Sequence, residues 1–128
     1  HDPHSFLQTV FNQMKADDIF IFTTLSGIGI DIQLLGEHSK ALSPPHHLNF
    51  FNPKSVSNLL VKCGFEVITA ETPGKLDMDI IYKNKDYIKD PYWKNLLTYF
   101  DQNDLDSMQQ KIAEIGLSSH MMITCKKP

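Results

Sequence analysis

The sequence predicts an α/β protein built on part of a doubly wound sheet, with an antiparallel last strand and a helical insertion before that strand. Three observations support this fold class. A capped amphipathic helix leads directly into a short apolar strand, the same order recurs after a long loop, and a third apolar segment closes the chain. Repeated helix-to-strand steps build doubly wound folds. At 128 residues, we expect one domain over residues 1–128.

The first helix begins at Asp2 and Pro3, a capping carboxylate followed by a proline at the first helical position. Apolar residues then recur at helical spacing as far as Lys15, which predicts a core-facing helix. Residues 19–24 are all β-branched or aromatic. They predict a strand buried on both faces, as in parallel sheets that carry helices on each side.

A long loop over residues 25–52 is interrupted by glycines and prolines, with a short helix expected at residues 30–35. Loops of this length in compact domains usually serve a function or move. A second capped helix begins at Asn52 and ends at Gly64, where a left-handed residue is favoured. The next strand is expected at residues 65–71.

Residues 76–116 predict the helical insertion, with Asp77, Asp90 and Asp104 as helix caps and Gly116 as its end. The apolar residues 120–125 predict the last strand. We expect it to run antiparallel beside residues 19–24.

Composition excludes several classes of function. The formal charge is −3, and all 12 basic residues are lysines. Because arginine supplies the planar fork that reads bases and clamps phosphates, its absence argues against a nucleic-acid partner. No segment approaches the roughly 18 apolar residues of a membrane span, and the N-terminus lacks the order of a signal peptide, so we expect no membrane partner and a cytoplasmic location.

The two cysteines, Cys63 and Cys125, lie far apart and outside any CxxC pair. They are expected to be reduced thiols in a core. Adjacent histidines such as His46 and His47 point apart, and structural zinc sites draw on closely spaced ligand pairs. No metal site is therefore expected.

Residues 44–55, PPHHLNFFNPKS, followed by the CGFEV of residues 63–67, resemble a signature near the end of many bacterial S-adenosylmethionine-dependent methyltransferase domains. The opening Asp2-Pro3, the segment 21–29, the segment 72–77 and the closing residues 118–121 resemble further members, in the same order. The chain is therefore similar to the C-terminal half of a class I, Rossmann-like methyltransferase. It departs from the family at residues 24–26, where members commonly carry Thr-Pro-Asn.

The resemblance implies S-adenosylmethionine as the cofactor of a longer protein. The family's glycine-rich turn and the acidic residue that holds the ribose would lie upstream of His1, so we expect this chain to lack most of the cofactor site and to be inactive alone. Asp2 is the candidate for a cofactor contact, although capping a helix also explains it.

The long loop follows the carboxyl end of a strand, which is where doubly wound sheets bind ligands. His46 and His47 are the candidate catalytic residues, because imidazole can remove a proton near neutral pH. The alternative is that they bind the loop backbone. Candidate contacts to the methyl acceptor are Ser26, Gly27, Asn49 and Phe50, and the alternative for Phe50 is an anchor of the loop to the core.

Two hypotheses of function remain. The first is the acceptor-side portion of a methyltransferase, and the second is a non-catalytic α/β interaction or regulatory module with the same fold. Likeness of fold does not define a substrate, so the acceptor stays open between a small metabolite, a lipid headgroup, a sugar and a protein side chain. The oligomeric state stays open too, although a partial sheet leaves an edge that tends to pair.

Overall fold

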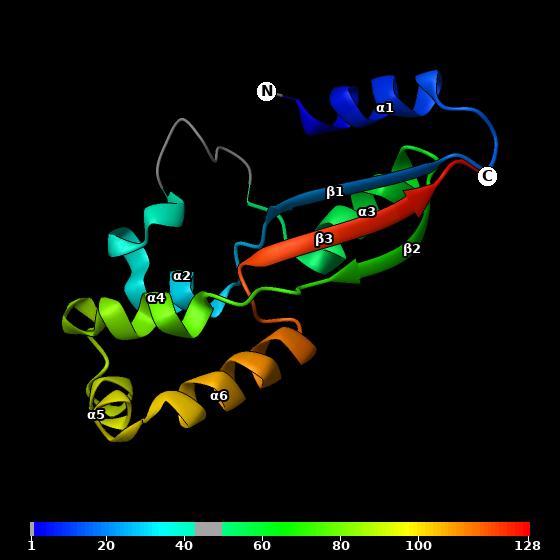
Figure 1. Ribbon diagram of the computed structural model, residues 1–128. Helices are drawn as coiled ribbons and strands as arrows, with labels where there is room; N and C mark the ends of the chain where they lie inside the picture. Colours follow the sequence, from blue (N-terminus) through cyan, green and yellow to red (C-terminus); the bar gives the residue numbers. More distant parts are fainter. Residues whose placement is uncertain (1, 43–49) are drawn as a thin grey trace.

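A computed structural model describes residues 2–42 and 50–128 of the chain. It contains a three-stranded sheet in the order β1-β3-β2, formed by β1 (Ile19–Leu25), β2 (Glu66–Glu71) and β3 (His120–Lys126). β3 pairs antiparallel with both neighbours, so β1 and β2 run parallel to each other (Figure 1). The predicted antiparallel strand beside residues 19–24 is confirmed.

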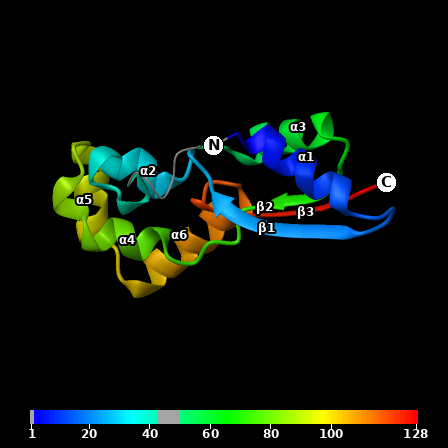
Figure 2. The ribbon, with the colours of Figure 1, turned by 90° about the horizontal axis from the view of Figure 1, so that it is seen from above.

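Two helices, α1 (Pro3–Gln13) and α3 (Pro53–Lys62), lie on one face of this sheet (Figure 2). Their apolar stripes pack against the inward side chains of the strands, because apolar positions recur with the helical period in α1 and α3 and with a period of two in β3. The buried residues of this core are Leu7, Val56, Leu60, Cys63, Phe65, Met121, Ile123 and Cys125.

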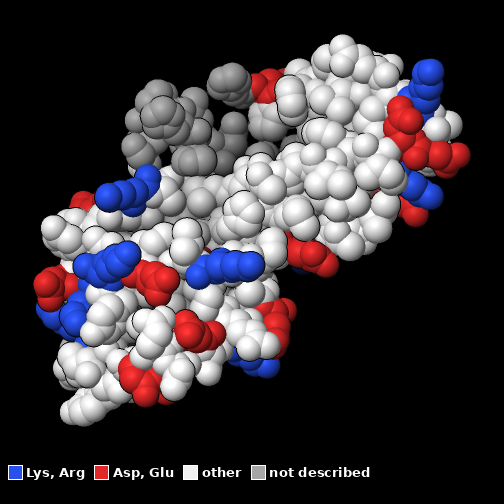
Figure 3. All heavy atoms as spheres, in the orientation of Figure 1, with Lys and Arg blue, Asp and Glu red and all other residues white. Residues whose placement is uncertain are grey.

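The other face of the sheet is open, so the prediction that residues 19–24 are buried on both faces is wrong. Along β1 the outward side chains are exposed, and Ile21 is 59% exposed, whereas Phe20 and Phe22 pack into the core. The physical reason is that the described helices beside the sheet all lie on its other side. Figure 3 shows that few charged side chains lie over the strands on this open face.

β2 is irregular where its alternation of apolar and polar residues is also irregular. The register to β3 shifts between Val67 and Thr69, and Ile68 between them is exposed. A bulge of this kind adds one residue to one strand of an antiparallel pair.

The helical part has a core of its own. It consists of α2 (Ile30–Leu35), α4 (Asp77–Lys83), α5 (Pro91–Tyr99) and α6 (Gln102–Glu114), with short 3-10 turns at Gly36–His38, Lys40–Leu42 and Lys85–Tyr87. These helices lie beyond the end of the sheet where β1 and β2 finish (Figure 1). Their buried residues are Leu35, Met78, Ile81, Ile88, Leu97, Leu105 and Ile112.

Three predicted helix starts are confirmed. Asp2, Asn52 and Asp90 each accept hydrogen bonds from backbone N–H groups in the first turn of their helix, and a proline follows each of them. Gly64 and Gly116, the predicted helix ends, have φ of 101° and 83°. Only glycine adopts this left-handed conformation without a steric penalty.

Two predicted caps are wrong. The N-cap of α4 is Leu76, and the Asp77 carboxylate instead bonds to residues distant in sequence. The N-cap of α6 is Asp101, and Asp104 is the third residue of the helix, where it completes a capping box with Asp101. Both positions lie in the first turn of a helix, where a carboxylate is favourable even when it is not the cap.

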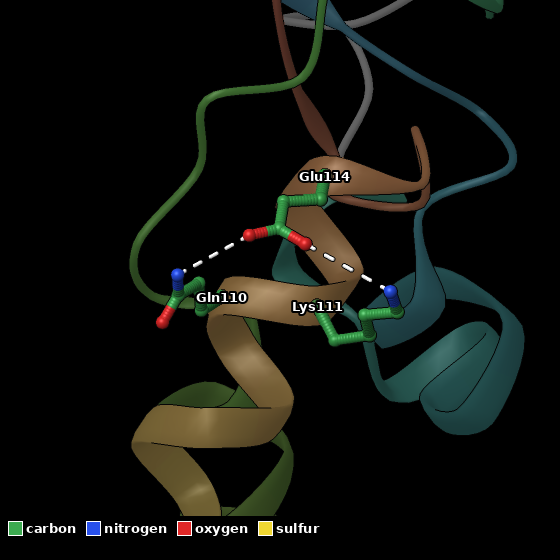
Figure 4. A network of polar contacts seen from close by, with 3 residues as sticks. All are labelled: Gln110, Lys111 and Glu114. Carbon is green, nitrogen blue, oxygen red and sulfur yellow. Dashed lines mark hydrogen bonds and ion pairs between the residues drawn. The ribbon is translucent and has the colours of Figure 1, made fainter.

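The outer face of α6 carries charges that are paired within the helix. Glu114 accepts a hydrogen bond from the Gln110 amide at 3.2 Å and pairs with the Lys111 ammonium at 3.9 Å (Figure 4). No helix in the described residues combines the length and the apolar character that crossing a bilayer demands.

Candidate functional site

An open cleft of about 640 Å³ lies at the end of the sheet where β1 and β2 finish and β3 begins. Three segments form it: the end of β1, the turn from β2 into α4, and the start of β3. The described lining residues are Thr23, Thr24, Leu25, Pro73, Gly74, Lys75, Leu76, Asp77, Ile80, Ser119 and His120. The carboxyl ends of parallel strands are where doubly wound sheets bind ligands, so this cleft is the candidate functional site.

The rim of the cleft is partly apolar and partly polar. Leu76 is 64% exposed and Ile80 is exposed as well, so apolar carbon lies open to solvent there. Lys75 and His120 are also exposed. The cleft can therefore offer one apolar surface and at least one positive charge to a ligand.

Asp77 is the buried acidic residue of the lining, at 3% exposure. Its Oδ2 accepts hydrogen bonds from Ser118 Oγ at 2.7 Å and Gln109 Nε2 at 2.8 Å. Its Oδ1 accepts from the Ser119 N–H at 2.8 Å and from Ser119 Oγ at 3.1 Å. The carboxylate thereby joins the start of α4 to α6 and to the residues just before β3.

These bonds also determine the charge of Asp77. Burial by itself would raise the pKa of the Asp77 carboxyl, but the hydrogen bonds from the Ser119 N–H, Gln109, and the Ser118 and Ser119 hydroxyls outweigh it, and the pKa is lowered. Asp77 is therefore ionised at neutral pH, and both of its oxygens are hydrogen-bonded inside the fold.

A second carboxyl group, Asp31 in α2, is 3% exposed and lies close enough to Asp77 for electrostatic repulsion between the two carboxylates. Burial raises the pKa of Asp31; the Ser119 hydroxyl opposes that rise, and repulsion from Asp77 adds to it. Its Oδ1 finds no hydrogen-bond partner among the described residues. A buried carboxyl group in this state disfavours ionisation.

The backbones approach closely at this junction. A Cβ added to Gly74 would overlap the Ser118 hydroxyl, and one added to Gly29 would overlap Ser119. Glycine is needed at both positions because any side chain would push the helical part away from the start of β3. The spacing of the cleft walls depends on these contacts.

Of the predicted acceptor contacts, Ser26, Gly27 and Phe50 lie together beside the end of β1. The Ser26 N–H donates to the Ser119 carbonyl and the Gly27 N–H donates to the Phe51 carbonyl, each at 2.7 Å. Ser26 is fully buried, whereas Phe50 is 46% exposed. These residues adjoin the cleft at the same end of the sheet.

His46, His47 and Asn49, the other predicted residues of the loop, lie outside the described residues. Phe51, next to Phe50, is half-buried against the core under the sheet. The loop is therefore anchored at Phe51, at the same end of the sheet as the cleft.

Asp2, the predicted cofactor contact, caps α1. Its side chain accepts from the His4 N–H at 3.0 Å, the Ser5 N–H at 3.3 Å and the Ser5 hydroxyl at 2.6 Å. The Ser5 hydroxyl bond is the main reason why the pKa of Asp2 is lowered. α1 begins at the end of the sheet where β1 finishes (Figures 1 and 2).

Sequence reasoning missed Lys75, Thr23 and His120 as lining residues. His120 stands at the start of the predicted last strand, where a structural role is expected, and Lys75 lies within the segment 72–77 without a predicted role of its own. A usable signal is present: polar residues follow one predicted strand at residues 72–77 and precede another at residues 118–120. When two such strands are antiparallel neighbours, the residues after one lie beside the residues before the other.

Within residues 2–42 and 50–128, no group of three or more histidine, cysteine, aspartate or glutamate side chains is arranged to hold a metal ion. The two cysteines of the chain, Cys63 and Cys125, are free and buried, as the sequence predicts.

No protein-family model and no curated protein matches the chain. Comparison with solved structures defines the class of fold: the chain has a methyltransferase-like α/β fold. One structure that shows this is Haemonchus contortus phosphoethanolamine N-methyltransferase 2 in complex with phosphomonomethylethanolamine and S-adenosylhomocysteine, with a TM-score of 0.53 and 18% identity. The match covers 99% of this chain and 30% of that one.

Proposed function

We propose that the chain is the C-terminal, acceptor-side portion of an S-adenosylmethionine-dependent methyltransferase and is inactive by itself. The observation that supports this most is a methyltransferase-like fold over 99% of the chain, with a cleft at the carboxyl ends of its parallel strands. In that role the chain would orient the methyl acceptor and shield it from water, which is a large part of catalysis in group transfer.

S-adenosylmethionine is the proposed cofactor of the full-length protein, held mostly by residues outside this chain. Asp2, the residue of this chain proposed to contact the cofactor, already accepts three hydrogen bonds within its own helix. Asp2 at the start of α1 would therefore contribute at most an edge of that site.

The proposed catalytic residues are His46 and His47, with acceptor contacts from Ser26, Gly27, Asn49 and Phe50. The support is the place of this loop: its described ends, at Gly27 and Phe51, are joined by a hydrogen bond at the same end of the sheet as the cleft. A histidine there could remove a proton from an acceptor group.

Calorimetry with the 128-residue chain tests where the cofactor binds. We expect no measurable affinity for S-adenosylmethionine. Tight binding would show that a complete cofactor site lies within these residues.

The full-length protein tests the function itself. We expect it to bind S-adenosylmethionine and transfer its methyl group, and His46→Ala or His47→Ala to reduce transfer with cofactor affinity nearly unchanged. Unchanged turnover in both variants would leave the histidines a structural role. A full-length protein that neither binds the cofactor nor transfers a methyl group would instead be a non-catalytic interaction or regulatory module.

We further propose a cytoplasmic protein that forms one domain over residues 1–128, with residues 76–116 as an insertion, and no nucleic-acid or membrane partner. The absence of arginine argues against binding to nucleic acid.

Burial raises the pKa of the Cys63 thiol and raises that of Cys125 to about 11, so both stay as unreactive thiols.

A further inference from the structure

We propose that the cleft binds an acceptor that carries one anionic group and an apolar body, with Lys75 and His120 holding the anion and the exposed rim of Leu76 and Ile80 covering the body. The inference rests on the proposed function, because it names the class of acceptor that this end of the sheet would take. None of these four residues is among the site residues predicted from sequence.

Lys75 brings to the cleft a positive charge that is not engaged in an ion pair with a described residue. No acidic side chain of the described residues lies within 4.0 Å of its ammonium, and the residues outside the described ranges include no acidic one. Lys111, by contrast, is paired with Glu114 on α6 (Figure 4). A lysine without a partner at a cleft is available to a ligand anion.

The acidic residue of the described lining, Asp77, keeps its negative charge because its partners are neutral, but it forms no ion pair with Lys75. Each of its two oxygens already accepts two hydrogen bonds from donors within the fold, so a ligand finds no free oxygen on it. A cationic ligand therefore has no open carboxylate to pair with among the described lining residues.

His120 and Thr23 lie on the same face of the sheet, and both can donate hydrogen bonds to a ligand. His120 pairs with Leu25 in the register between β1 and β3, and Thr23 lies two residues before Leu25, so all three side chains point to the open face. Imidazole donates at least one hydrogen bond and a hydroxyl donates one. Together with Lys75 they make a set of donors suited to carboxylate or phosphate oxygens.

Apolar surface forms the rest of the rim. Leu76, just before α4, and Ile80, in its first turn, are both exposed. Leu25 and Pro73 also line the cleft. Covering such surface with the carbon skeleton of a ligand is favourable because it removes apolar area from water. A volume of about 640 Å³ falls within the usual range for small-molecule sites, roughly 300–1,000 Å³.

Titration of the 128-residue chain with four six-carbon probes tests this, followed by backbone amide shifts in NMR and by calorimetry. Hexanoate and hexyl phosphate present the anion, hexan-1-ol removes it, and hexylammonium reverses it. We expect the anions to bind with shifts confined to residues 23–25, 73–80 and 118–120, and the neutral and cationic probes to bind at least about threefold more weakly, as the loss of one exposed ion pair predicts. The two anions distinguish a carboxylate acceptor from a phosphate ester.

Lys75→Gln is the decisive variant, because it keeps much of the apolar stem and removes the charge. We expect it to weaken anion binding about three- to fivefold and to leave hexan-1-ol binding unchanged. Lys62→Gln, the same charge change on α3 behind the sheet, is the matched control and should bind like the parent chain. Equal binding of the alcohol and the anions, or no effect of Lys75→Gln, would overturn the inference.

Probe binding and methyl transfer, measured separately, distinguish a failure of this inference from a failure of the proposed function. Probe binding needs neither cofactor nor turnover, so anion binding in the cleft of a protein that transfers no methyl group would support the inference and contradict the function. In an active full-length enzyme, Lys75→Gln should raise KM for the acceptor with kcat nearly unchanged. An unchanged KM would overturn the inference and leave the function standing.

Discussion

The Asp77 carboxylate accepts a hydrogen bond of 2.8 Å from the Ser119 N–H, across 42 positions of the sequence. Asp77 is the first residue of α4 and Ser119 immediately precedes β3, so this contact ties the helical part to the sheet at the wall of the cleft. The stability of the chain and the shape of the cleft should therefore respond together to changes at this junction.

Asp77→Asn should lower the free energy of unfolding by about 2 kcal/mol, because hydrogen bonds to a charged acceptor are replaced by weaker ones and an amide NH₂ meets a donor. Urea unfolding followed by circular dichroism measures this. Asp86→Asn, at an exposed carboxylate in the Lys85–Tyr87 turn, is the control and should change stability by less than about 0.5 kcal/mol. Equal effects of the two substitutions would contradict the role given to Asp77.

Asp31→Asn should stabilise the chain at neutral pH. The pKa of Asp31 is raised in the folded state, so its contribution to stability is complete below the ordinary pKa of 3.8 and is lost as pH rises through the folded value. The variant should therefore melt above the parent chain at neutral pH, and this advantage should shrink in acid. Thermal melts over a pH series measure the difference.

Asp77→Asn provides the opposite trend in the same melts. The pKa of Asp77 is lowered by folding, so its contribution is present above 3.8 and is lost as pH falls through the folded value. The loss of stability caused by Asp77→Asn should be largest at neutral pH and smaller in acid. A pH-independent effect of either substitution would show that its carboxyl group has the same pKa folded and unfolded.

Because helices cover only one face of the sheet, truncation of two isoleucines on opposite faces should lower stability by different amounts. Ile123 in β3 is fully buried in the core beneath α1 and α3, whereas Ile21 in β1 is 59% exposed on the open face. Ile123→Ala should cost about 3 kcal/mol, as truncation of a buried isoleucine usually does, and Ile21→Ala less than about 1 kcal/mol. Urea unfolding of both variants measures this, and equal costs would show that the open face is covered in solution.

Gly74→Ala should destabilise the chain by about 2 kcal/mol, because the added methyl group overlaps the Ser118 hydroxyl and the close approach must open. The double variant with Ser118→Ala removes the overlapping oxygen. Its loss of stability should therefore be smaller than the sum of the two single losses, by about 1 kcal/mol. Additive losses in urea unfolding would place the strain of Gly74→Ala elsewhere.

Much of the local structure could be predicted from sequence, because the interactions responsible span only a few residues. Asp2 and Asn52, each followed by proline, place the starts of α1 and α3, and Gly64 and Gly116 place helix ends. The same local rule misplaced the caps of α4 and α6. In α6 two carboxylates, Asp101 and Asp104, both satisfy the rule, and in α4 the cap is Leu76, which has no capping side chain.

The sequence by itself determined which segments form helices and strands, and that the last strand is antiparallel to the first. Only the tertiary structure decided that one face of the sheet is open and that Asp77 serves the junction rather than a helix cap. The reason is distance along the chain: the hydrogen-bond partners of Asp77 at Gln109, Ser118 and Ser119 lie 32 to 42 positions away. Sequence patterns that span a few residues cannot predict contacts between residues so far apart, whereas folding brings these groups within hydrogen-bonding distance.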